Sequence, residues 1–265
     1  MAIASFFDPG FTGSLGDYSA YRRKDSKKLI LRRKGGASAE QFKKSPKMAG
    51  VRAHQIVFGS WSKMGKSIRA AMFNVSKLGH SHLSSQINTL CQDIYNLDAE
   101  PAVGSKRSIL VANGLHMLQG YNLNKVNTFD SVISTPVTAV LNRQQFKATV
   151  SLPPLNPGSN FMNPWDSPYF KIKINLGIVR DMYFDGKEYR TFSSSVLDTA
   201  ELIETDWLYV NDTHAAQTFE LQLDEPSLDV HAYMLVAIGI EFGAQRKGGI
   251  KAVKDACCGK ILVVG

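Results

Sequence analysis

The chain has 265 residues, of which 44% are hydrophobic, and its formal net charge is +8. This length and hydrophobic content suffice for a sizeable core, which excludes a wholly disordered chain. No stretch approaches the roughly 20 apolar residues of a membrane helix, and the first ten residues lack the pattern of a secretory signal. We therefore expect a cytoplasmic protein with no membrane partner.

The charge is distributed unevenly along the chain. Residues 1–80 contain 16 Lys and Arg against four acidic residues, whereas residues 127–265 contain 12 basic and 16 acidic residues. A chain with one basic end and a mildly acidic body is expected to bind an anionic partner. Both nucleic acid and the acidic surface of another copy of the chain fit this distribution.

The first segment, residues 1–50, is expected to be an extended basic arm. Residues 15–23 and 28–34 flank a polar four-residue turn, which predicts a β-hairpin. Its basic side chains are those of Arg22, Arg23, Lys24, Lys27, Lys28, Arg32, Arg33 and Lys34. We interpret them as an interaction surface, and a merely solvated surface is the alternative. The apolar contacts beside them would come from Phe6, Phe7 and Phe11.

The second segment, residues 51–126, has the apolar periodicity of helices. Apolar residues from Leu83 to Leu97 recur at a spacing near 3.6, which predicts a helix with Cys91 on its buried side. Two further helices are expected at residues 63–77 and 107–119.

From residue 127 onward the apolar period changes to two. Between residues 170 and 179, large apolar residues alternate with Lys171, Lys173 and other residues, which predicts a strand with one buried and one mostly solvated face. Residues 232–242 are apolar on nearly both faces and are expected to form a central strand. Further strands are expected at residues 134–141, 146–152, 189–197, 219–223 and 260–264.

These elements predict an α+β fold in three parts. A basic N-terminal β-hairpin segment covers residues 1–50, a small helical layer covers residues 51–126, and a C-terminal antiparallel β-sandwich of immunoglobulin-like size covers residues 127–265. Three cysteines, two of them adjacent, exclude a disulfide framework. The disulfide and tryptophan core of antibody domains is therefore not expected.

One stretch approaches a phosphate-binding motif. Gly59 precedes Gly65-Lys66-Ser67 with five residues between the two glycines, whereas the motif requires four. The extra residue displaces the first turn, and Trp61 is bulky for a loop that must enclose an anion. We interpret the match as a coincidence and expect the lysines here to extend the basic surface.

Several acidic and histidine residues have the chemistry for acid–base catalysis but lack an accompanying motif. No nucleophile motif lies near them, so we interpret the acids as residues on the rim of the sandwich. The groups are Asp181/Asp185, Glu201/Glu204/Asp206, Asp224/Glu225/Asp229, Asp212/His214 and Asp229/His231. His80, His82 and His116 lack a second ligand set that would define a metal site. We expect no enzyme activity, no metal, no cofactor and no small-molecule substrate.

Several separated patches resemble those of uncharacterised proteins from Bacteroidota bacteria. They include Gly13-Ser14-Leu15-Gly16, Gly35-Gly36-Ala37-Ser38, Ser45-Pro46-Lys47, Lys106-Arg107-Ser108-Ile109-Leu110 and Phe129-Asp130-Ser131. Those proteins combine a basic N-terminal segment, a helical middle and a β-rich C-terminal half. The resemblance implies no activity and assigns no site residue.

The prediction for function is a non-enzymatic structural protein that forms a homo-oligomer. Its basic N-terminal arm would dock on the acidic rim of a neighbouring subunit, at residues such as Glu201, Glu204 and Asp206. The alternative is a sequence-tolerant nucleic-acid-binding protein that uses the same hairpin. In that case Tyr18 and Tyr21, which lie among the arginines, would stack on bases.

Overall fold

The computed structural model of the protein describes residues 12–22, 28–97, 108–192, 200–224 and 228–265. Contacts between residues divide the chain into two units, Met1–His54 and Gln55–Gly265. Helices and several antiparallel sheets are both present, so the predicted α+β class is confirmed at this level. None of the helices in the described ranges combines the length and the apolar character that crossing a bilayer requires.

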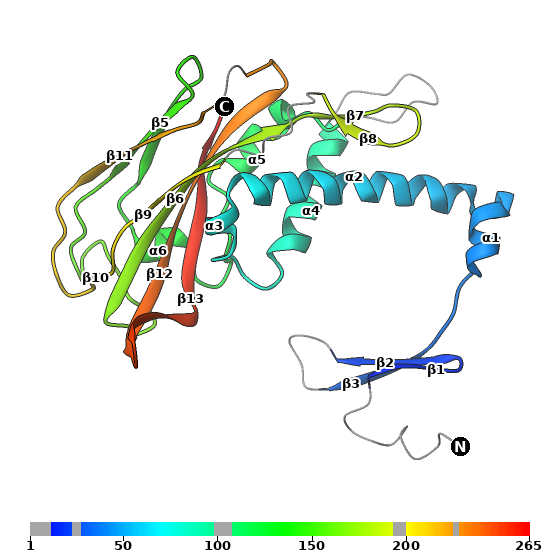
Figure 1. The fold of residues 1–265 in the computed structure, drawn as a ribbon, viewed down its shortest axis with the longest axis horizontal. Coiled ribbons are helices and arrows are strands. Elements are labelled where there is room, and N and C mark those ends of the chain that lie inside the picture. Colours follow the sequence, from blue (N-terminus) through cyan, green and yellow to red (C-terminus); the bar gives the residue numbers. More distant parts are fainter. Residues whose placement is uncertain (1–11, 23–27, 98–107, 193–199, 225–227) are drawn as a thin grey trace. The chain divides into compact units, whose positions relative to one another are not determined.

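The first unit contains a small antiparallel sheet of three strands (Figure 1). Its strands, in spatial order, are β1 (Gly13–Leu15), β2 (Tyr18–Arg22) and β3 (Leu29–Arg33). Strands β2 and β3 form the predicted hairpin, and its predicted turn lies among residues 23–27, outside the described residues. The predicted first strand is wrong in one respect. Gly16 adopts a φ of 53° and reverses the chain, which creates β1 as an additional strand.

A short helix follows this sheet. Helix α1 (Ala39–Lys44) begins with a capping box, in which the Ser38 hydroxyl accepts from the Gln41 N–H and the Gln41 side chain accepts from the Ser38 N–H. The 3-10 helix η2 (Pro46–Met48) comes next, with its proline at the first position, where a missing N–H costs no hydrogen bond.

Helix α2 (Ala49–Ala71) spans 23 residues and crosses the boundary between the two units. The helix predicted at residues 63–77 is therefore the second half of a longer one. It ends early because Met72 leaves the helical region at φ −122° and ψ 40°, and the short helix α3 (Phe73–Ser76) follows.

Helix α4 (Leu83–Leu97) has the bounds that its apolar spacing predicts, and Cys91 is fully buried in it, as predicted. The prediction of a helix at residues 107–119 is wrong. Only the 3-10 helix η3 (Val111–Gly114) and the four-residue α5 (Leu115–Leu118) form there. The N–H and C=O of Ile109 instead bond to the backbone of Met182, which holds this part of the chain extended.

The second unit is organised around an antiparallel sheet with β6 (Tyr169–Arg180) and β12 (Ala232–Arg246) at its centre (Figure 1). Strand β13 (Gly249–Val264) pairs with the other edge of β12. Strands β9 (Ala200–Glu204) and β10 (Leu208–Tyr209) both pair with the outer edge of β6. The predicted central strand at residues 232–242 is confirmed.

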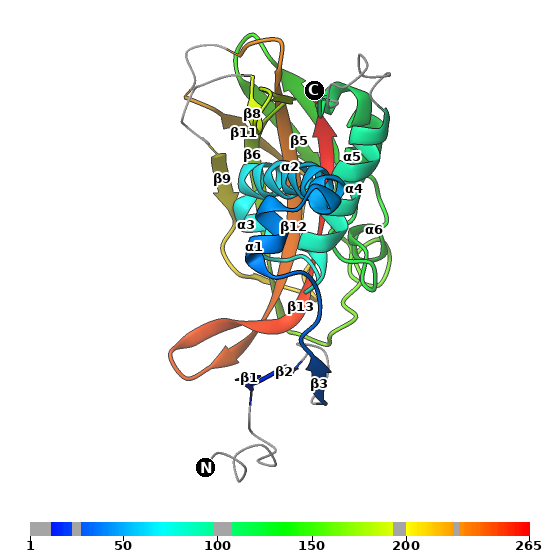
Figure 2. The same cartoon turned by 90° about the vertical axis from the view of Figure 1, so that its right-hand side faces the viewer.

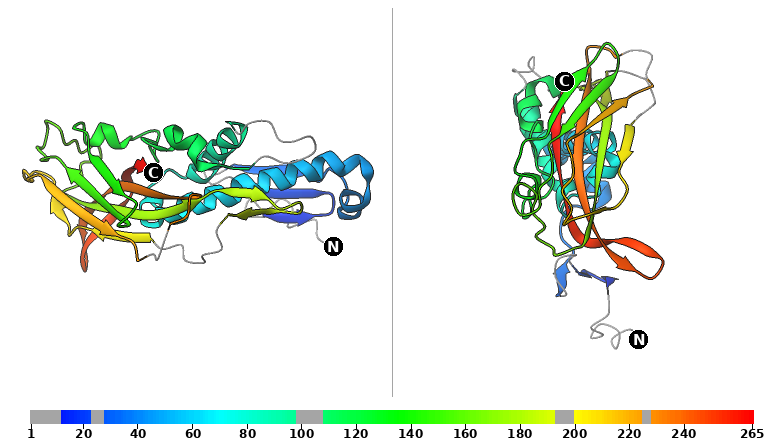
Figure 3. Two further views of the ribbon diagram at one scale, coloured as in Figure 1. Left: turned by 90° about the horizontal axis from the view of Figure 1, so that it is seen from above. Right: turned by 90° about the vertical axis from the view of Figure 1, so that its left-hand side faces the viewer.

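A second sheet has the order β11-β5-β4 and faces one side of the central sheet (Figure 3). Its strands are β4 (Thr138–Asn142), β5 (Lys147–Leu152) and β11 (Gln217–Gln222), each overlapping a predicted strand. Buried side chains of both sheets, together with those of α6 (Phe129–Val132), form one hydrophobic cluster. A separate hairpin consists of β7 (Met182–Phe184) and β8 (Tyr189–Thr191). The rest of the strand predicted at 189–197 lies largely outside the described residues.

Helices cover the opposite face of the central sheet (Figure 2). The prediction of a mostly solvated face on β6 is therefore wrong, because Asn175, Gly177 and Val179 are buried there. Gly177 permits this cover: a Cβ on it would lie 2.6 Å from the Cα of Ala71, at the end of α2. The face looks polar in the sequence because small residues replace large apolar ones where the helix approaches.

Candidate interaction surface

The predicted basic hairpin forms most of the small sheet, and its register assigns each side chain to a face. Directly paired residues of antiparallel strands lie on the same face. One face, here called the leucine face, carries Leu15, Tyr18, Ala20, Arg22, Leu29, Leu31 and Arg33. The other face carries Ser14, Ser19, Tyr21, Ile30 and Arg32. The leucine face thus has an apolar centre with an arginine near each end.

Among the described residues of this sheet, Ala20 alone is buried. Tyr18, Leu29 and Leu31 are 45%, 39% and 48% exposed, respectively. A small sheet gains stability when its hydrophobic face packs against another surface. Within the described residues, the larger side chains of Tyr18, Leu29 and Leu31 on the leucine face are not packed in this way.

The described basic residues of the arm are all exposed: Arg22, Lys28, Arg32, Arg33 and Lys34. Arg32 donates from Nε to the Ser19 hydroxyl at 3.3 Å and lies over the ring of Tyr21. Lys34 donates from Nζ to the Gly16 carbonyl at 2.8 Å. The other predicted contact residues of the arm lie outside the described residues: Phe6, Phe7, Phe11, Arg23, Lys24 and Lys27.

Lys44 and Arg52, which follow the sheet, contact groups in or beside helix α1. Lys44 forms an exposed ion pair with Glu40, one turn away in α1. Arg52 donates from Nη1 to the carbonyls of Phe42 and Ser45, at 2.7 and 3.0 Å. Arg52 therefore satisfies carbonyls at the C-terminal end of α1 that the helix itself leaves without a donor.

The stretch that approaches a phosphate-binding motif lies inside α2. Its backbone N–H groups donate to carbonyls within the helix, so they are not free to bind a phosphate. Ser60 and Gly65 are buried. Lys63 does not simply extend a basic surface, since its Nζ contacts the Glu188 carboxylate at 3.2 Å and the Tyr189 carbonyl at 3.1 Å.

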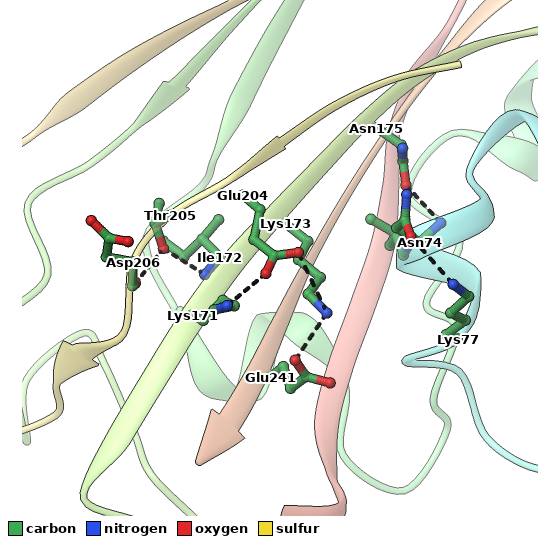
Figure 4. A network of polar contacts seen from close by, with 11 residues as sticks. Asn74, Lys77, Lys171, Ile172, Lys173, Asn175, Glu204, Thr205, Asp206 and Glu241 are labelled. Carbon is green, nitrogen blue, oxygen red and sulfur yellow. Dashed lines mark hydrogen bonds and ion pairs between the residues drawn. The ribbon is translucent and has the colours of Figure 1, made fainter. Parts of the chain in front are cut away.

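A charged network lies on the central sheet beside the helices (Figure 4). Lys171 and Lys173 project from β6, and Glu204 of β9 accepts from the first at 2.5 Å and lies 3.7 Å from the second. Lys173 also contacts Glu241 of β12 at 2.9 Å. The hydrogen bond from Lys171 and the nearby Lys173 charge lower the pKa of Glu204. The network neutralises two lysines that the sequence places on a solvated face.

Asn175 connects this sheet to the helices, as Figure 4 also shows. Its Oδ1 accepts from the N–H groups of Asn74 and Val75, both at 3.0 Å, and its Nδ2 donates to the Glu201 carbonyl at 3.1 Å. One buried amide therefore satisfies the start of α3 and links β6 to β9. The sequence gives no signal for this role beyond a polar residue in an alternating strand.

These contacts correct the predicted acidic rim. Glu201 and Glu204 lie on strand β9 rather than in a loop, and Glu204 is engaged by two lysines of its own chain. Glu201, Glu204 and Asp206 are each exposed as whole residues. Of the three, Glu204 is the least suitable as a partner for a neighbouring arm because its charge is already paired.

A buried aspartate, Asp181, contacts the half-buried His231 where β6 meets β7. The Asp181 carboxylate accepts from the Val111 N–H at 2.6 Å and lies 3.0 Å from Nδ1 of His231 and 3.5 Å from the Tyr233 hydroxyl. Burial raises the pKa of Asp181, and these hydrogen bonds partly oppose that effect. The sequence-based prediction that Asp181 is a rim acid is therefore wrong. The ring of Phe192 stacks on His231 at 3.9 Å, which limits access to one side of the imidazole.

The three cysteines are free thiols. Burial raises the pKa of Cys91 to about 12 and that of Cys257 to about 11, so neither is a thiolate at neutral pH. Burial also raises the pKa of Cys258. The described residues contain no group of three His, Cys, Asp or Glu side chains that could hold a metal ion.

Comparison with protein-family models, curated proteins and solved structures found no match to this chain.

Proposed function

We propose that the protein is a non-enzymatic structural protein that assembles with copies of itself, and that the leucine face of the β1–β3 sheet is the contact. The observation that carries the proposal is a basic sheet on which Tyr18, Leu29 and Leu31 of one face stay 45%, 39% and 48% exposed. A partner that covers this face would supply the packing that the sheet lacks.

The leucine face has the composition of a protein-binding surface. Tyr and Arg are enriched at such contacts, and here Arg22 pairs with Leu29, Arg33 pairs with Tyr18, and Leu31 lies between these two pairs. Fully burying one large apolar side chain contributes about 1.5–3 kcal/mol, whereas an exposed ion pair contributes only about 0–1 kcal/mol. The apolar centre would therefore supply most of the affinity, and the arginines would orient the docking.

The acidic partner surface on the neighbouring copy would be one whose charges are not already paired. Glu201, Asp206 and Glu220 are exposed acids on or beside β9 and β11. They suit an arginine better than Glu204, which two lysines already contact.

The test is the mass of the full-length protein in solution, measured by light scattering at tens of micromolar. The variant Leu29→Ser/Leu31→Ser should reduce the mass toward the 29.2 kDa of a single chain. The matched control Ser19→Ala/Arg32→Gln changes the opposite face and should leave the mass unchanged. A wild-type protein that is already monomeric, or equal behaviour of the two variants, would reject the proposal.

A second candidate function is binding of single-stranded nucleic acid, which the opposite face of the same sheet favours. There Tyr21 and Arg32 form an exposed pair, a combination that can stack on bases and contact phosphates. In that case Tyr21→Ala/Arg32→Gln should abolish binding of a mixed-sequence oligonucleotide without changing the mass. Retained binding by this variant would exclude the second candidate.

We also propose that the two sheets of the second unit form an antiparallel sandwich of immunoglobulin-like size. Support comes from their shared core, in which Val150 and Leu221 of the smaller sheet belong to the same buried cluster as Ile174 and Val236 of the central sheet. Nuclear Overhauser contacts between methyl groups of the smaller sheet and methyl groups of the central sheet would test this packing. Their absence in a well-folded sample would contradict it.

A cytoplasmic location is part of the proposal. It is supported by three free cysteines, which are typical of a reducing compartment. Cell fractionation with a specific antibody tests it, and recovery of the protein from outside the cytoplasm would reject it.

A further inference from the structure

The β12–β13 hairpin continues beyond the central sheet as a two-stranded ribbon. Strand β12 pairs with β6 as far as Gly243, and residues 244–246 pair only with residues 249–251 of β13. Figure 2 shows this part of the hairpin bending away from the strands of the sheet. Within the described parts of the chain, the tip therefore has no third strand on either edge, and none of residues 244–251 is buried.

The ribbon concentrates unpaired positive charge. Four of the 12 basic residues in residues 127–265 lie within nine positions, at Arg246, Lys247, Lys251 and Lys254, and all four are exposed. None of their side chains forms a hydrogen bond or ion pair with another residue in the described parts of the chain. Elsewhere on the central sheet, Lys173 of β6 and Lys260 of β13 each have a carboxylate partner. The local charge is thus opposite in sign to the net charge of this half of the chain.

Glycines determine the shape of the ribbon at its tip and at its base. Gly248 and Gly249 turn the chain at φ values of 91° and 116° and add no side chain at the tip. Arg246 and Lys251 share one face, because Lys251 pairs with Ala244, two residues before Arg246. At the base, the Trp207 ring packs so closely on Gly243 that a Cβ there would lie 2.5 Å from it.

The fourth basic residue, Lys254, lies next to a register shift in the pairing of β12 with β13. The pairing of β12 with β13 is interrupted between Glu241 and Gly243, and Asp255 adopts a φ of 61° in the unpaired stretch of β13. A bulge of this kind bends a ribbon and redirects its side chains. Lys254 lies in this stretch and is exposed, so the basic surface continues from the tip to the base of the ribbon.

We propose that this ribbon binds the phosphate backbone of double-stranded nucleic acid without reading its sequence. A two-stranded ribbon fits the major groove of a duplex, and release of counterions by four basic residues supplies the affinity. Residues 243–256 contain no aromatic side chain, so the ribbon cannot stack on unpaired bases. It also offers almost no exposed apolar surface, and exposed ion pairs alone bind an acidic protein poorly.

The proposal does not rest on self-assembly through the leucine face, and its test separates the two. Three proteins are titrated against a labelled mixed-sequence duplex of about 30 base pairs. They are the wild type, a ribbon variant and an arm variant. The ribbon variant is Arg246→Gln/Lys247→Gln/Lys251→Gln/Lys254→Gln, and the arm variant is Arg22→Gln/Arg32→Gln/Arg33→Gln/Lys34→Gln. Each variant removes four positive charges. Binding is measured by fluorescence anisotropy at 50 and 200 mM NaCl, and the folded state is checked by thermal unfolding.

Four phosphate contacts give a slope of about −3.6 for log K against log salt, so wild-type affinity should fall roughly 150-fold between the two salt concentrations. The ribbon variant should bind at least about tenfold more weakly at 50 mM NaCl and lose most of that slope. The arm variant should retain both. The ribbon variant should also keep the wild-type mass by light scattering.

Four outcomes would overturn the proposal. They are absence of wild-type binding, equal losses in both variants, a loss confined to the arm variant, and a ribbon variant whose mass changes while its duplex affinity does not. Competition by polyglutamate as effective as that of the unlabelled duplex, charge for charge, would likewise show that the ribbon binds acidic polypeptide instead.

Discussion

The β1–β3 sheet and the central sheet use the same antiparallel pairing and differ in what covers them. Strands β2 and β3 pair through five residues each, and β6 and β12 pair through twelve. In the small sheet only Ala20 is buried among the described residues, whereas β12 is buried on both faces over most of its length. Backbone hydrogen bonds are thus available in both sheets, but among the described residues a hydrophobic core covers only the central sheet.

This difference shows what each sheet depends on. A backbone hydrogen bond contributes only about 0.5–1.5 kcal/mol net, because water satisfies the same groups in the unfolded chain. Burial therefore determines whether a sheet is stable alone. The central sheet carries its own cover on both faces, whereas Tyr18, Leu29 and Leu31 of the small sheet stay 45%, 39% and 48% exposed.

The largest expected effect comes from placing a charge at equivalent positions of the two sheets. Ile174→Asp buries an unpaired carboxylate in the core between the sheets and should reduce the free energy of unfolding by more than about 3 kcal/mol. Leu31→Asp, on an exposed face, should change it by less than about 0.5 kcal/mol. Urea unfolding followed by circular dichroism measures both. Similar losses would mean that the small sheet has a cover of its own.

An intermediate effect is expected at Lys173, which lies on the central sheet but at the edge of its helical cover. Lys173→Asp would place three carboxylates together and should cost about 2–4 kcal/mol, and Lys173→Met, which keeps the apolar stem, should cost about half as much. The exposed pair of Lys44 provides the control, since Lys44→Asp should change stability little. Equal effects at the two lysines in urea unfolding would show that the network is solvated.

The smallest expected effect is a difference in pH dependence. Burial raises the pKa of Asp181, so its contribution to stability is complete below the pKa of the unfolded chain and is lost as pH rises through the folded pKa. Unfolding measured from pH 3.5 to 7 should therefore show the wild type losing stability relative to Asp181→Asn as pH rises.

Asp185 provides a control of opposite sign. Hydrogen bonds from the N–H groups of Glu188 and Lys187 lower its pKa, so its contribution is present above the unfolded pKa and is lost as pH falls. Relative to Asp185→Asn, the wild type should lose stability toward low pH. If both variants gave the same trend, Asp181 would be solvated rather than buried.

Local patterns predict the fold well where large apolar side chains mark each buried face of an element. Helix α4 has its predicted bounds because only one of its faces is apolar, and the central strand at residues 232–242 is recognisable because both faces are. The cover on β6 escaped prediction. Gly177 lets α2 approach because it has no Cβ, and Asn175 binds the start of α3 through two hydrogen bonds. Neither feature adds hydrophobicity to the sequence.

The candidate sites show the same limit over longer distances. The basic hairpin is predictable because its residues are neighbours in the sequence. Asp181 and His231 are 50 positions apart, and only the pairing of β12 with β6 brings them together. The basic ribbon of β12 and β13 is hidden in a segment whose total charge is negative, because a sum over residues 127–265 conceals a local excess.

The close approach of α2 and α3 to the central sheet also provides a way to recognise relatives of this protein. A Cβ at Gly177 would meet the backbone of Ala71, and one at Gly239 would lie 2.5 Å from the side chain of Leu78. At Gly177 a larger residue would have to move the end of α2, and at Gly239 it would have to displace the Leu78 side chain, so these glycines should persist after most other positions have changed. Two glycines about 62 positions apart, each within an apolar strand, form a fingerprint that structural alignment of distant sequences can use.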